Sequence, residues 1–500
     1  MTSISGYVNR STLTMQMLTQ MRWQLDDLQR QLATGKRADT YGALGVGRTM
    51  DLEARMRLSR VQTYESSIAS VDLRVGIMDT ALERLRKIGE ETRSELRFPA
   101  TYELLGNQTQ SQQLAAMNLD EALSLLNEKA GERYLFSGRA TDSRATVTAQ
   151  QLLNGDGARA GLKQIMAERL LADTGVDGRG RLDEPAVNGD VVTLAEDGAH
   201  PFGFKLSSVT TDFGATVTPT AGPPASFDID LGGNNPPLGG SIQVRLTLPD
   251  GSTSDIVLTA TLESPPPPGT FRLGIDTDTT AANLAAAIDE SVIALGRTEL
   301  AAASAVRAGE DFFAIDADNP PQRVDGPPFD TATGLRDGTA ADTVFWYTGE
   351  GAVDSARNTA IARVDETITV SYGARANEDG IRQVVQNVAV FASMTFSESD
   401  PDARDRYFAL VQRIGNGLDA DDATKQIEAI QTDIAGAQLA ANAAKERLED
   451  KKPVLQGIVD EIENISPEEV GVKLLALNTR MQATMQTTAI LSQFTLLSYL

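Results

Sequence analysis

Carboxylates at 173–184 have the spacing of a calcium-binding loop. Asp173, Asp177 and Glu184 fall on positions one, five and twelve of such a loop, with Gly178 at position six. Oxygen ligands at these positions suit Ca²⁺. Gly175 occupies position three, where a ligand is expected, and no helix is predicted to follow. An acidic loop without a metal is therefore the simpler interpretation, and calcium binding is its alternative.

Few other residues have the chemistry of a catalytic site. The single histidine, His200, precedes a proline and is expected in a loop, with no serine elbow or oxyanion donor predicted near it. The chain has no cysteine, which excludes disulfides, thiolate metal ligands and cysteine nucleophiles. The glycines of GALGVG at 42–47 are wrongly spaced for a dinucleotide-binding loop. We therefore expect no enzymatic activity and no cofactor.

The overall charge also narrows the choice of partners. A net charge of −24 opposes the attraction to phosphate that supplies most nucleic-acid affinity, so nucleic acid is not expected as a partner.

The N-terminal segment has neither the basic nor the apolar region of a cleavable signal peptide. Export by the general secretory route is therefore not expected.

Apolar side chains near both ends recur at spacings of three and four, which is the period of one helix face. The N-terminal stripe comprises Leu18, Met21, Leu25, Leu28 and Leu32, and the C-terminal stripe comprises Leu474, Leu477, Met481, Met485, Leu491, Phe494 and Leu497. The last twenty residues carry no charge, but nine of them are polar, and polar groups in lipid each need a partner. We therefore predict helices buried among protein helices and no membrane span.

Similar stripes continue toward the middle of the chain with heptad-like spacing. In the N-terminal half of the chain they include Val61, Ile68, Val75 and Leu82. In the C-terminal half they include Ile427, Ile434, Leu448 and Ile458. We predict that these inner stripes cover each other in an intramolecular bundle. Pro453 lies inside the second stripe and predicts a bend or break, and Ser466 followed by Pro467 predicts the start of the last helix.

The outermost pieces, 1–35 and 470–500, extend beyond this bundle. An uncovered apolar stripe costs about 25 cal/mol per Å² in water. We therefore predict that these pieces become fully covered only by copies of the same chain, in an assembly.

Between residues 141 and 373 the pattern changes to frequent glycine and proline with short alternating runs, which is typical of β structure. One helix, Ala281 to Leu295, is predicted within it. The predicted fold is a mostly α, coiled-coil-like helical bundle formed by both chain ends, with an inserted β-rich α+β outer region. Five segments are predicted. They are an N-terminal core helix that is disordered until assembly (1–45), the N-terminal half of the bundle (46–140), an insertion of one or two β-rich domains (141–373), the C-terminal half of the bundle (374–465) and a C-terminal core helix (466–500).

Four sequence stretches resemble the flagellin superfamily, whose terminal helices form the axial core of the bacterial flagellum. QLATGKRADT at 31–40 and AILSQFTLLSYL at 489–500 are similar to the family's terminal segments. GERYLFSGRATD at 131–142 is similar to a stretch of the hook-associated junction proteins of that superfamily, the third hook-associated proteins. IDTDTTAANLAAAID at 275–289 looks like a motif in insertions of these proteins.

The resemblance implies a structural role in motility, at the junction that connects the hook to the flagellin filament. It implies secretion to the flagellum by the flagellar type III pathway. The implied partners are copies of the same chain in a ring or tube, another hook-associated protein, flagellin, and a cytosolic export chaperone on the C-terminal helix. A flagellin that forms the filament itself is the alternative, and a secreted adhesin or enzyme with its activity in 141–373 is the second alternative.

Overall fold

The computed structural model describes residues 4–97, 102–315, 319–351, 354–419 and 423–497. The side chains described exclude those of 4–11, 14 and 491–497. The chain divides into two compact units. The terminal unit comprises Met1–Ser70, Ala362–Val370 and Leu439–Leu500, and the central unit comprises Val71–Ile361 and Ser371–Gln438.

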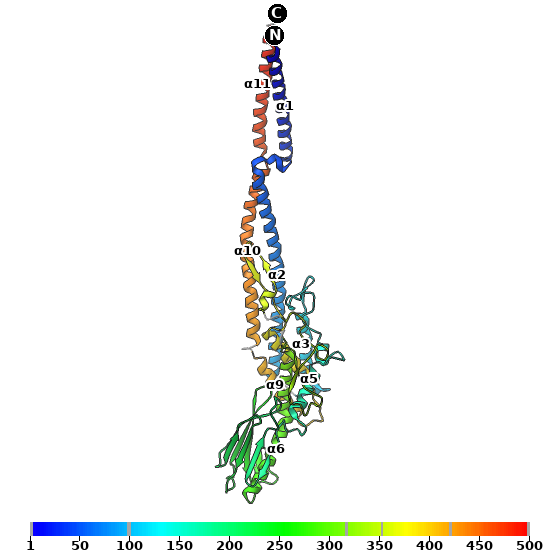
Figure 1. Cartoon of the computed structure of the whole chain (residues 1–500), viewed down its shortest axis with the longest axis vertical. Helices are drawn as coiled ribbons and strands as arrows, with labels where there is room; N and C mark the ends of the chain where they lie inside the picture. Colours follow the sequence, from blue (N-terminus) through cyan, green and yellow to red (C-terminus); the bar gives the residue numbers. More distant parts are fainter. Residues whose placement is uncertain (1–3, 98–101, 316–318, 352–353, 420–422, 498–500) are drawn as a thin grey trace. The chain divides into compact units, whose positions relative to one another are not determined.

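The terminal unit is built mainly from helices of both chain ends. Its helices are α1 (Ile4–Thr34), the 3₁₀ helix η1 (Tyr41–Gly47), α11 (Pro467–Leu497), and parts of α2 (Arg48–Arg97) and α10 (Lys425–Glu463). Figure 1 shows α1 and α11 side by side, and the two helices pack along each other. The predicted helices at both chain ends are therefore present.

Local residues explain where these helices begin and end. α1 ends before Gly35, whose φ of +68° is readily adopted only by glycine. α11 begins after Ser466, whose Oγ accepts a hydrogen bond from the Glu469 N–H at 3.1 Å, as predicted for an N-cap. A bend or break was predicted at Pro453; the helix does not break there, because α10 continues through it. Pro453 and Glu449 are both exposed, so water can satisfy the carbonyl that loses its helical donor.

Among the described residues, four helices of the central unit contact α8. The helices of this unit are α3 (Gln110–Leu126), α4 (Ala149–Asn154), α5 (Leu162–Thr174), α6 (Thr277–Leu295), the π-helical turn η2 (Gly296–Leu300), α7 (Ala301–Phe313), the 3₁₀ turn η3 (Ala356–Thr359), α8 (Asp379–Ser393) and α9 (Ala403–Gly417). The four that contact α8 are α3, α5, α7 and α9. The predicted helix Ala281–Leu295 is α6, which begins earlier because the Asp276 side chain caps the Thr279 N–H. The sequence analysis did not predict α4, α5 or α7. α5 buries charged side chains such as Arg169, whereas α7 buries Ala305, Ala308 and Phe312 at helical spacing, a signal that was overlooked.

Two four-stranded sheets form the β part of the central unit. The strand orders are β12-β11-β10-β7 and β5-β6-β9-β8. The strands are β5 (Ala186–Asn188), β6 (Val191–Ala195), β7 (Lys205–Thr211), β8 (Thr216–Thr220), β9 (Ser226–Asp230), β10 (Ser241–Thr247), β11 (Thr253–Thr261) and β12 (Thr270–Arg272). Neighbouring strands pair antiparallel except β11 and β12, which pair parallel.

Short strand pairs complete the β structure of the described residues. They are β1 (Leu104–Leu105) with β2 (Gln108–Thr109), β3 (Lys129–Ala130) with β4 (Arg133–Tyr134), β13 (Gln322–Val324) with β14 (Leu335–Asp337), and β15 (Ile361–Arg363) with β16 (Thr369–Ser371). Residues 344–347 form no strand, and isolated bridges occur at Thr343 and Tyr347.

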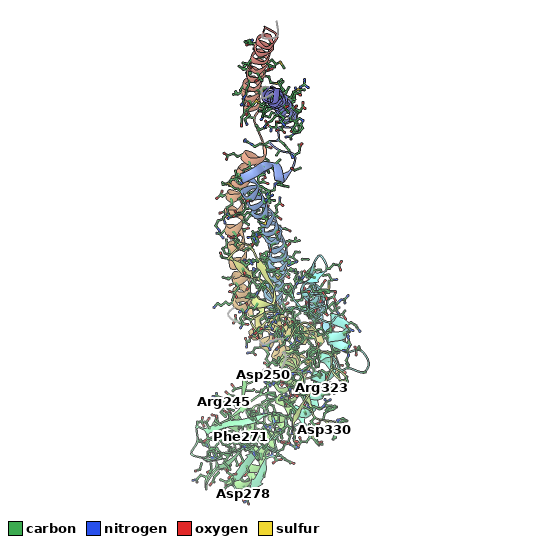
Figure 2. The ribbon with its side chains drawn as sticks, turned by 45° about the horizontal axis from the view of Figure 1, so that its top comes forward. Arg245, Asp250, Phe271, Asp278, Arg323 and Asp330 are labelled. Carbon is green, nitrogen blue, oxygen red and sulfur yellow. The ribbon has the colours of Figure 1, made fainter. Side chains whose placement is uncertain are left out.

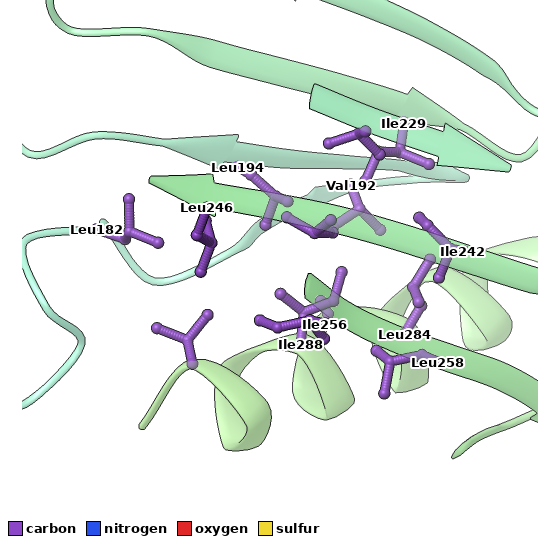
Figure 3. Packing of buried hydrophobic residues seen from close by; sticks show 14 of the residues in the cluster. Leu182, Val192, Leu194, Ile229, Ile242, Leu246, Ile256, Leu258, Leu284 and Ile288 are labelled. Carbon is purple, nitrogen blue, oxygen red and sulfur yellow. The ribbon is translucent and has the colours of Figure 1, made fainter. Parts of the chain in front are cut away.

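One apolar core lies between the two large sheets and α6. Figure 3 shows side chains of both sheets and of the helix converging, among them Val192, Ile229, Ile242, Leu258, Leu284 and Ile288, all at most 1% exposed. Alternate residues of each strand point into this core, as the pleat requires. The chain therefore has helical ends and a middle region that contains β-sheet.

Candidate assembly surface

The predicted terminal stripes are covered in part within a single chain. Met21 of α1 and Leu477 of α11 are only 8% and 7% exposed. Five further stripe residues are half-buried: Leu18, Leu25, Leu28, Leu474 and Met481. From the sequence, we expected these stripes to be fully covered only by neighbouring copies. In the structure, α1 and α11 pack on each other and bury part of both stripes within one chain.

Other members of the predicted stripes are exposed or lie outside the described side chains. Leu32 is 47% exposed and Met485 is 52% exposed. Leu491, Phe494 and Leu497 belong to α11, but their side chains lie outside the described part. The stripes are therefore incompletely covered where they can be followed.

The linkers before α2 and α11 are joined by backbone hydrogen bonds. Lys36 and Asn464 form an antiparallel bridge. The Arg37 N–H donates to the Glu463 carbonyl at 2.7 Å, and the Ile465 N–H donates to the Gly35 carbonyl at 2.9 Å. These bonds hold the C-terminal end of α1 beside the N-terminal end of α11.

A second group of apolar side chains on the terminal helices is more than half exposed. We call it the outer apolar set. Its members are Leu13, Met15, Met17 and Trp23 on α1, and Val472, Leu475 and Ile490 on α11, which are 52–72% exposed. Trp23 lies about 200° around the helix from Met21, because consecutive residues are separated by about 100°. A patch of this kind usually marks a surface that another protein covers.

Sequence reasoning did not identify Trp23, Val472 or Leu475 as interface residues. Each lies off the three-four spacing that defined the stripes. A signal was nevertheless present, because an apolar helix end with side chains on several faces needs neighbours on several sides.

Seven of the eight predicted bundle residues are buried. Val61, Ile68, Val75, Leu82, Ile427, Ile434 and Leu448 are at most 5% exposed. Ile458 is half-buried, and its neighbour Val459 is buried instead. These residues belong to α2 and α10, which also exchange polar contacts.

Polar contacts show that α2 and α10 lie side by side within each unit. In the terminal unit, Lys452 Nζ lies 2.9 Å from a Glu65 carboxylate oxygen. In the central unit, Gln431 Nε2 donates to Asp79 Oδ1 at 2.8 Å. α2 and α10 are therefore paired in both places.

Asp51, in the first turn of α2, is an unusual buried carboxylate. Its side chain is fully buried, and neither carboxylate oxygen has a hydrogen-bond partner among the described residues. The nearest cation is Arg55, with Nε at 3.5 Å from Oδ2. Burial raises the pKa of Asp51, and the nearby Glu463 carboxylate adds to the increase. A charge at this position therefore destabilises the folded chain.

In the structure, the three acidic residues with calcium-loop spacing each pair with an arginine. Asp173 Oδ2 accepts a hydrogen bond from Arg169 at 2.8 Å, and Oδ1 accepts one from the Gly203 N–H at 2.9 Å. Asp177 and Glu184 instead pair with Arg179, at 2.9 and 3.7 Å. Across the described residues, no group of three or more acidic or histidine side chains could hold a metal ion.

Arginines neutralise further carboxylates inside the central unit. Arg169 also pairs with Asp311 at 2.9 Å, and both side chains are at most 8% exposed. Arg323, labelled in Figure 2, pairs with the buried Glu168 at 2.5 Å. His200 Nε2 hydrogen-bonds to Asp197, and its Nδ1 accepts from the Phe202 N–H at 3.3 Å. The polar groups of this region are therefore used to hold the fold together.

Comparison of the chain with family models and with curated proteins finds no match. Within the part of the chain that the structure describes, no helix has the length and apolarity needed to cross a membrane. The outer apolar set, which leaves apolar side chains of the terminal unit exposed to water, is the feature for which we seek a functional explanation.

Proposed function

We propose that this chain is a non-enzymatic structural subunit of the bacterial flagellum at the junction of hook and filament. Its terminal helices pack against those of neighbouring copies and connect the hook side to the flagellin filament. The observation that supports this most is the outer apolar set on both paired terminal helices. The resemblance of the terminal sequences to the flagellin superfamily supplies the identity of the assembly.

Two helices alone cannot cover apolar residues on several of their faces. α1 and α11 cover one face of each other, which leaves Trp23 and Leu475 at 72% and 71% exposure. In a ring or tube, each helix pair has neighbours on more than one side. Packing there removes the exposed apolar surface from water, at about 25 cal/mol per Å², and completes a coiled-coil-like bundle.

Before assembly the same surface requires protection. An exposed apolar face promotes premature association, and a groove that receives one helix face would prevent it. Val472 and Leu475, exposed on α11, supply such a face. We therefore propose that α11 binds a cytosolic export chaperone before assembly. The chain is then secreted through the flagellar type III pathway. In the flagellum it contacts another hook-associated protein and flagellin.

The alternative is a flagellin that forms the filament itself. The large middle region, with two four-stranded sheets, favours it, because outward-facing insertions of this size are expected on a filament subunit. Abundance and location distinguish the two roles. A junction protein is scarce and lies at one end of the filament, whereas a flagellin dominates sheared filaments.

The test is electron microscopy of flagella that contain a labelled copy of the chain, together with cells that produce a chain lacking 470–500. We expect label only where the filament meets the hook, and we expect the truncated chain to release unattached flagellin into the medium. Label along the whole filament would support the flagellin alternative. Normal filaments on cells with only the truncated chain would contradict both roles.

A further inference from the structure

The central unit contains asparagine–glycine pairs in different surroundings. The pairs are Asn154–Gly155, Asn188–Gly189 and Asn416–Gly417. In such a pair the glycine nitrogen can attack the side-chain amide of the asparagine, because glycine has no Cβ to obstruct the approach. The attack needs a backbone N–H that is not already hydrogen-bonded and a side chain that can rotate toward it. The local structure therefore decides which pair reacts.

The Asn188–Gly189 pair lies at the turn between β5 and β6. Asn188 is the last residue of β5 and pairs with Val191 across a two-residue turn. Both Asn188 and Gly189 are exposed. Among the described residues, neither the Asn188 side chain nor the Gly189 N–H has a hydrogen-bond partner. The nitrogen that would attack is therefore available.

β5 is an edge strand that can open without disturbing the core. It forms one end of its sheet, and all three of its residues are exposed. Apart from the chain neighbours of Gly189, the nearest atom to a Cβ built on this glycine is Asp278 Oδ1, at 3.8 Å. Local opening of such an edge breaks few contacts. The Asn188 side chain can therefore turn toward the Gly189 nitrogen while the rest of the unit stays folded.

The Asn154–Gly155 pair is held at the C-terminal end of α4. The Gly155 N–H donates to the Gln151 carbonyl at 2.9 Å. The Asn154 side chain is also fixed, because its Oδ1 accepts from Lys163 Nζ at 3.1 Å and its Nδ2 donates to the Gln150 carbonyl at 3.4 Å. An attack at this pair would first have to break these hydrogen bonds.

The Asn416–Gly417 pair is held in the last turn of α9. Gly417 is the last residue of the helix, so its N–H donates within the helical hydrogen-bond pattern. The Gly417 carbonyl accepts from Asn387 Nδ2 at 3.3 Å. Asn416 is exposed, as Asn188 is, so exposure does not distinguish the two pairs. They differ in whether the attacking nitrogen is already bonded.

We infer that Asn188 is a site of spontaneous deamidation, selected by the fold from the three pairs. The Gly189 nitrogen gives its proton to solvent and attacks Cγ of Asn188, which forms a C–N bond and a five-membered imide ring. The bond from Cγ to the side-chain nitrogen breaks, and this nitrogen takes a proton from solvent and leaves as ammonia. Water then opens the ring at either of its carbonyls and leaves an aspartate or an isoaspartate at position 188. The net reaction consumes one water and releases one ammonia.

The reaction changes the edge of the sheet. Either product adds a negative charge to the turn, close to Asp278, which Figure 2 labels. The isoaspartate also inserts one carbon into the backbone, which displaces the pairing of residue 188 with Val191. We expect β5 to loosen from β6 as a result. The reaction belongs to the central unit and does not depend on the proposed function.

Incubation of the folded full-length chain at mildly alkaline pH tests the site, with the other two pairs as internal controls. Mass spectrometry of a digest measures the deamidated fraction at each pair. Asn188 should react at least about tenfold faster than Asn154 and Asn416, which corresponds to about 1.4 kcal/mol. In urea the unfolded chain should show similar rates at all three, because the reacting residues are the same. If Asn188 is no faster in the folded chain, or equally favoured in the unfolded one, the inference is wrong.

The products test the route of the reaction. The imide gives isoaspartate as well as aspartate, whereas direct hydrolysis of the amide gives aspartate alone. Absence of isoaspartate at position 188 would therefore contradict attack by the Gly189 nitrogen. The rate should also rise with pH, because this nitrogen must lose its proton.

Asn188→Ser provides the matched control, because it removes the reacting amide from an exposed turn. The mass change should disappear from the peptide that contains position 188 and should remain unchanged at the other two pairs. Thermal unfolding checks that the variant folds like the wild type. A mass change that persists in this peptide would assign the reaction to another residue and overturn the inference.

Discussion

Truncation of Leu475 should weaken assembly without weakening the fold. Leu475→Ala removes three carbons, each worth about 0.8 kcal/mol when fully buried. Leu475 is 71% exposed in the single chain, so burial in the assembly can recover at most about 1.7 kcal/mol from these carbons. The association constant for this contact should therefore fall by about an order of magnitude. The loss should appear as a higher concentration for the onset of light scattering.

Leu477→Ala is the matched control, because it makes the same change two residues away on the same helix. Leu477 is 7% exposed and packs inside the α1–α11 pair. Its truncation should therefore lower the free energy of unfolding of the terminal unit by about 2–5 kcal/mol. Unfolding of α1 and α11, followed by circular dichroism, should shift for Leu477→Ala and stay within about 0.7 kcal/mol for Leu475→Ala. If Leu475→Ala assembles like the wild type, the outer apolar set is not an assembly surface.

Three further substitutions test the supporting structure. Arg169→Met leaves Asp173 buried without its cation, so the free energy of unfolding should fall by about 3–5 kcal/mol in urea titrations, and an unchanged midpoint would contradict the buried pair. Ser466→Ala removes the cap of α11 and should cost about 1 kcal/mol in thermal unfolding, whereas Ser466→Asp should cost much less. Asp51→Asn should stabilise the chain at pH 7 by on the order of 1 kcal/mol. Because burial raises the pKa of Asp51, the folded chain binds this proton more tightly than the unfolded chain, and stability is lost as pH rises through that window. The advantage of Asp51→Asn should therefore disappear below the ordinary pKa of 3.8, and a gain that persists there would contradict this assignment.

The helices at the chain ends were predictable because their apolar residues repeat with a helical period. Ser466 also marked a true boundary, since a capping hydroxyl acts through local geometry. The helix does not break at Pro453, and the sequence does not show that the affected carbonyl faces water. A long helix held along another helix tolerates one missing hydrogen bond.

The middle region was less predictable because its packing depends on contacts between distant residues. α5 places Arg169 and Asp173 one turn apart, and their partners include Asp311 and Gly203. In the sequence, Asp173 therefore looked like a calcium ligand in a loop. In the structure, its carboxylate is buried and accepts a hydrogen bond from Arg169. The β character of this region was predictable, because alternation of apolar residues is local to each strand.

Only the buried part of the candidate assembly surface could be predicted from the sequence. The three-four stripe identified Met21 and Leu477, which the structure buries between α1 and α11. Trp23 and Leu475, the exposed residues that now support the proposal, lie outside that stripe. Periodicity finds the face that a helix buries first, and only the packed structure shows which apolar residues are left over.

The most direct measurement is collisional quenching of tryptophan fluorescence in the full-length chain before and after assembly. The chain has two tryptophans, of which Trp23 is 72% exposed and Trp346 is fully buried. We predict that iodide quenches the Trp23 component in the single chain and that assembly protects it, while Trp346 contributes a constant unquenched background. If Trp23 remains as accessible to iodide in the assembled material as in the single chain, the outer face of α1 is not covered by neighbouring copies.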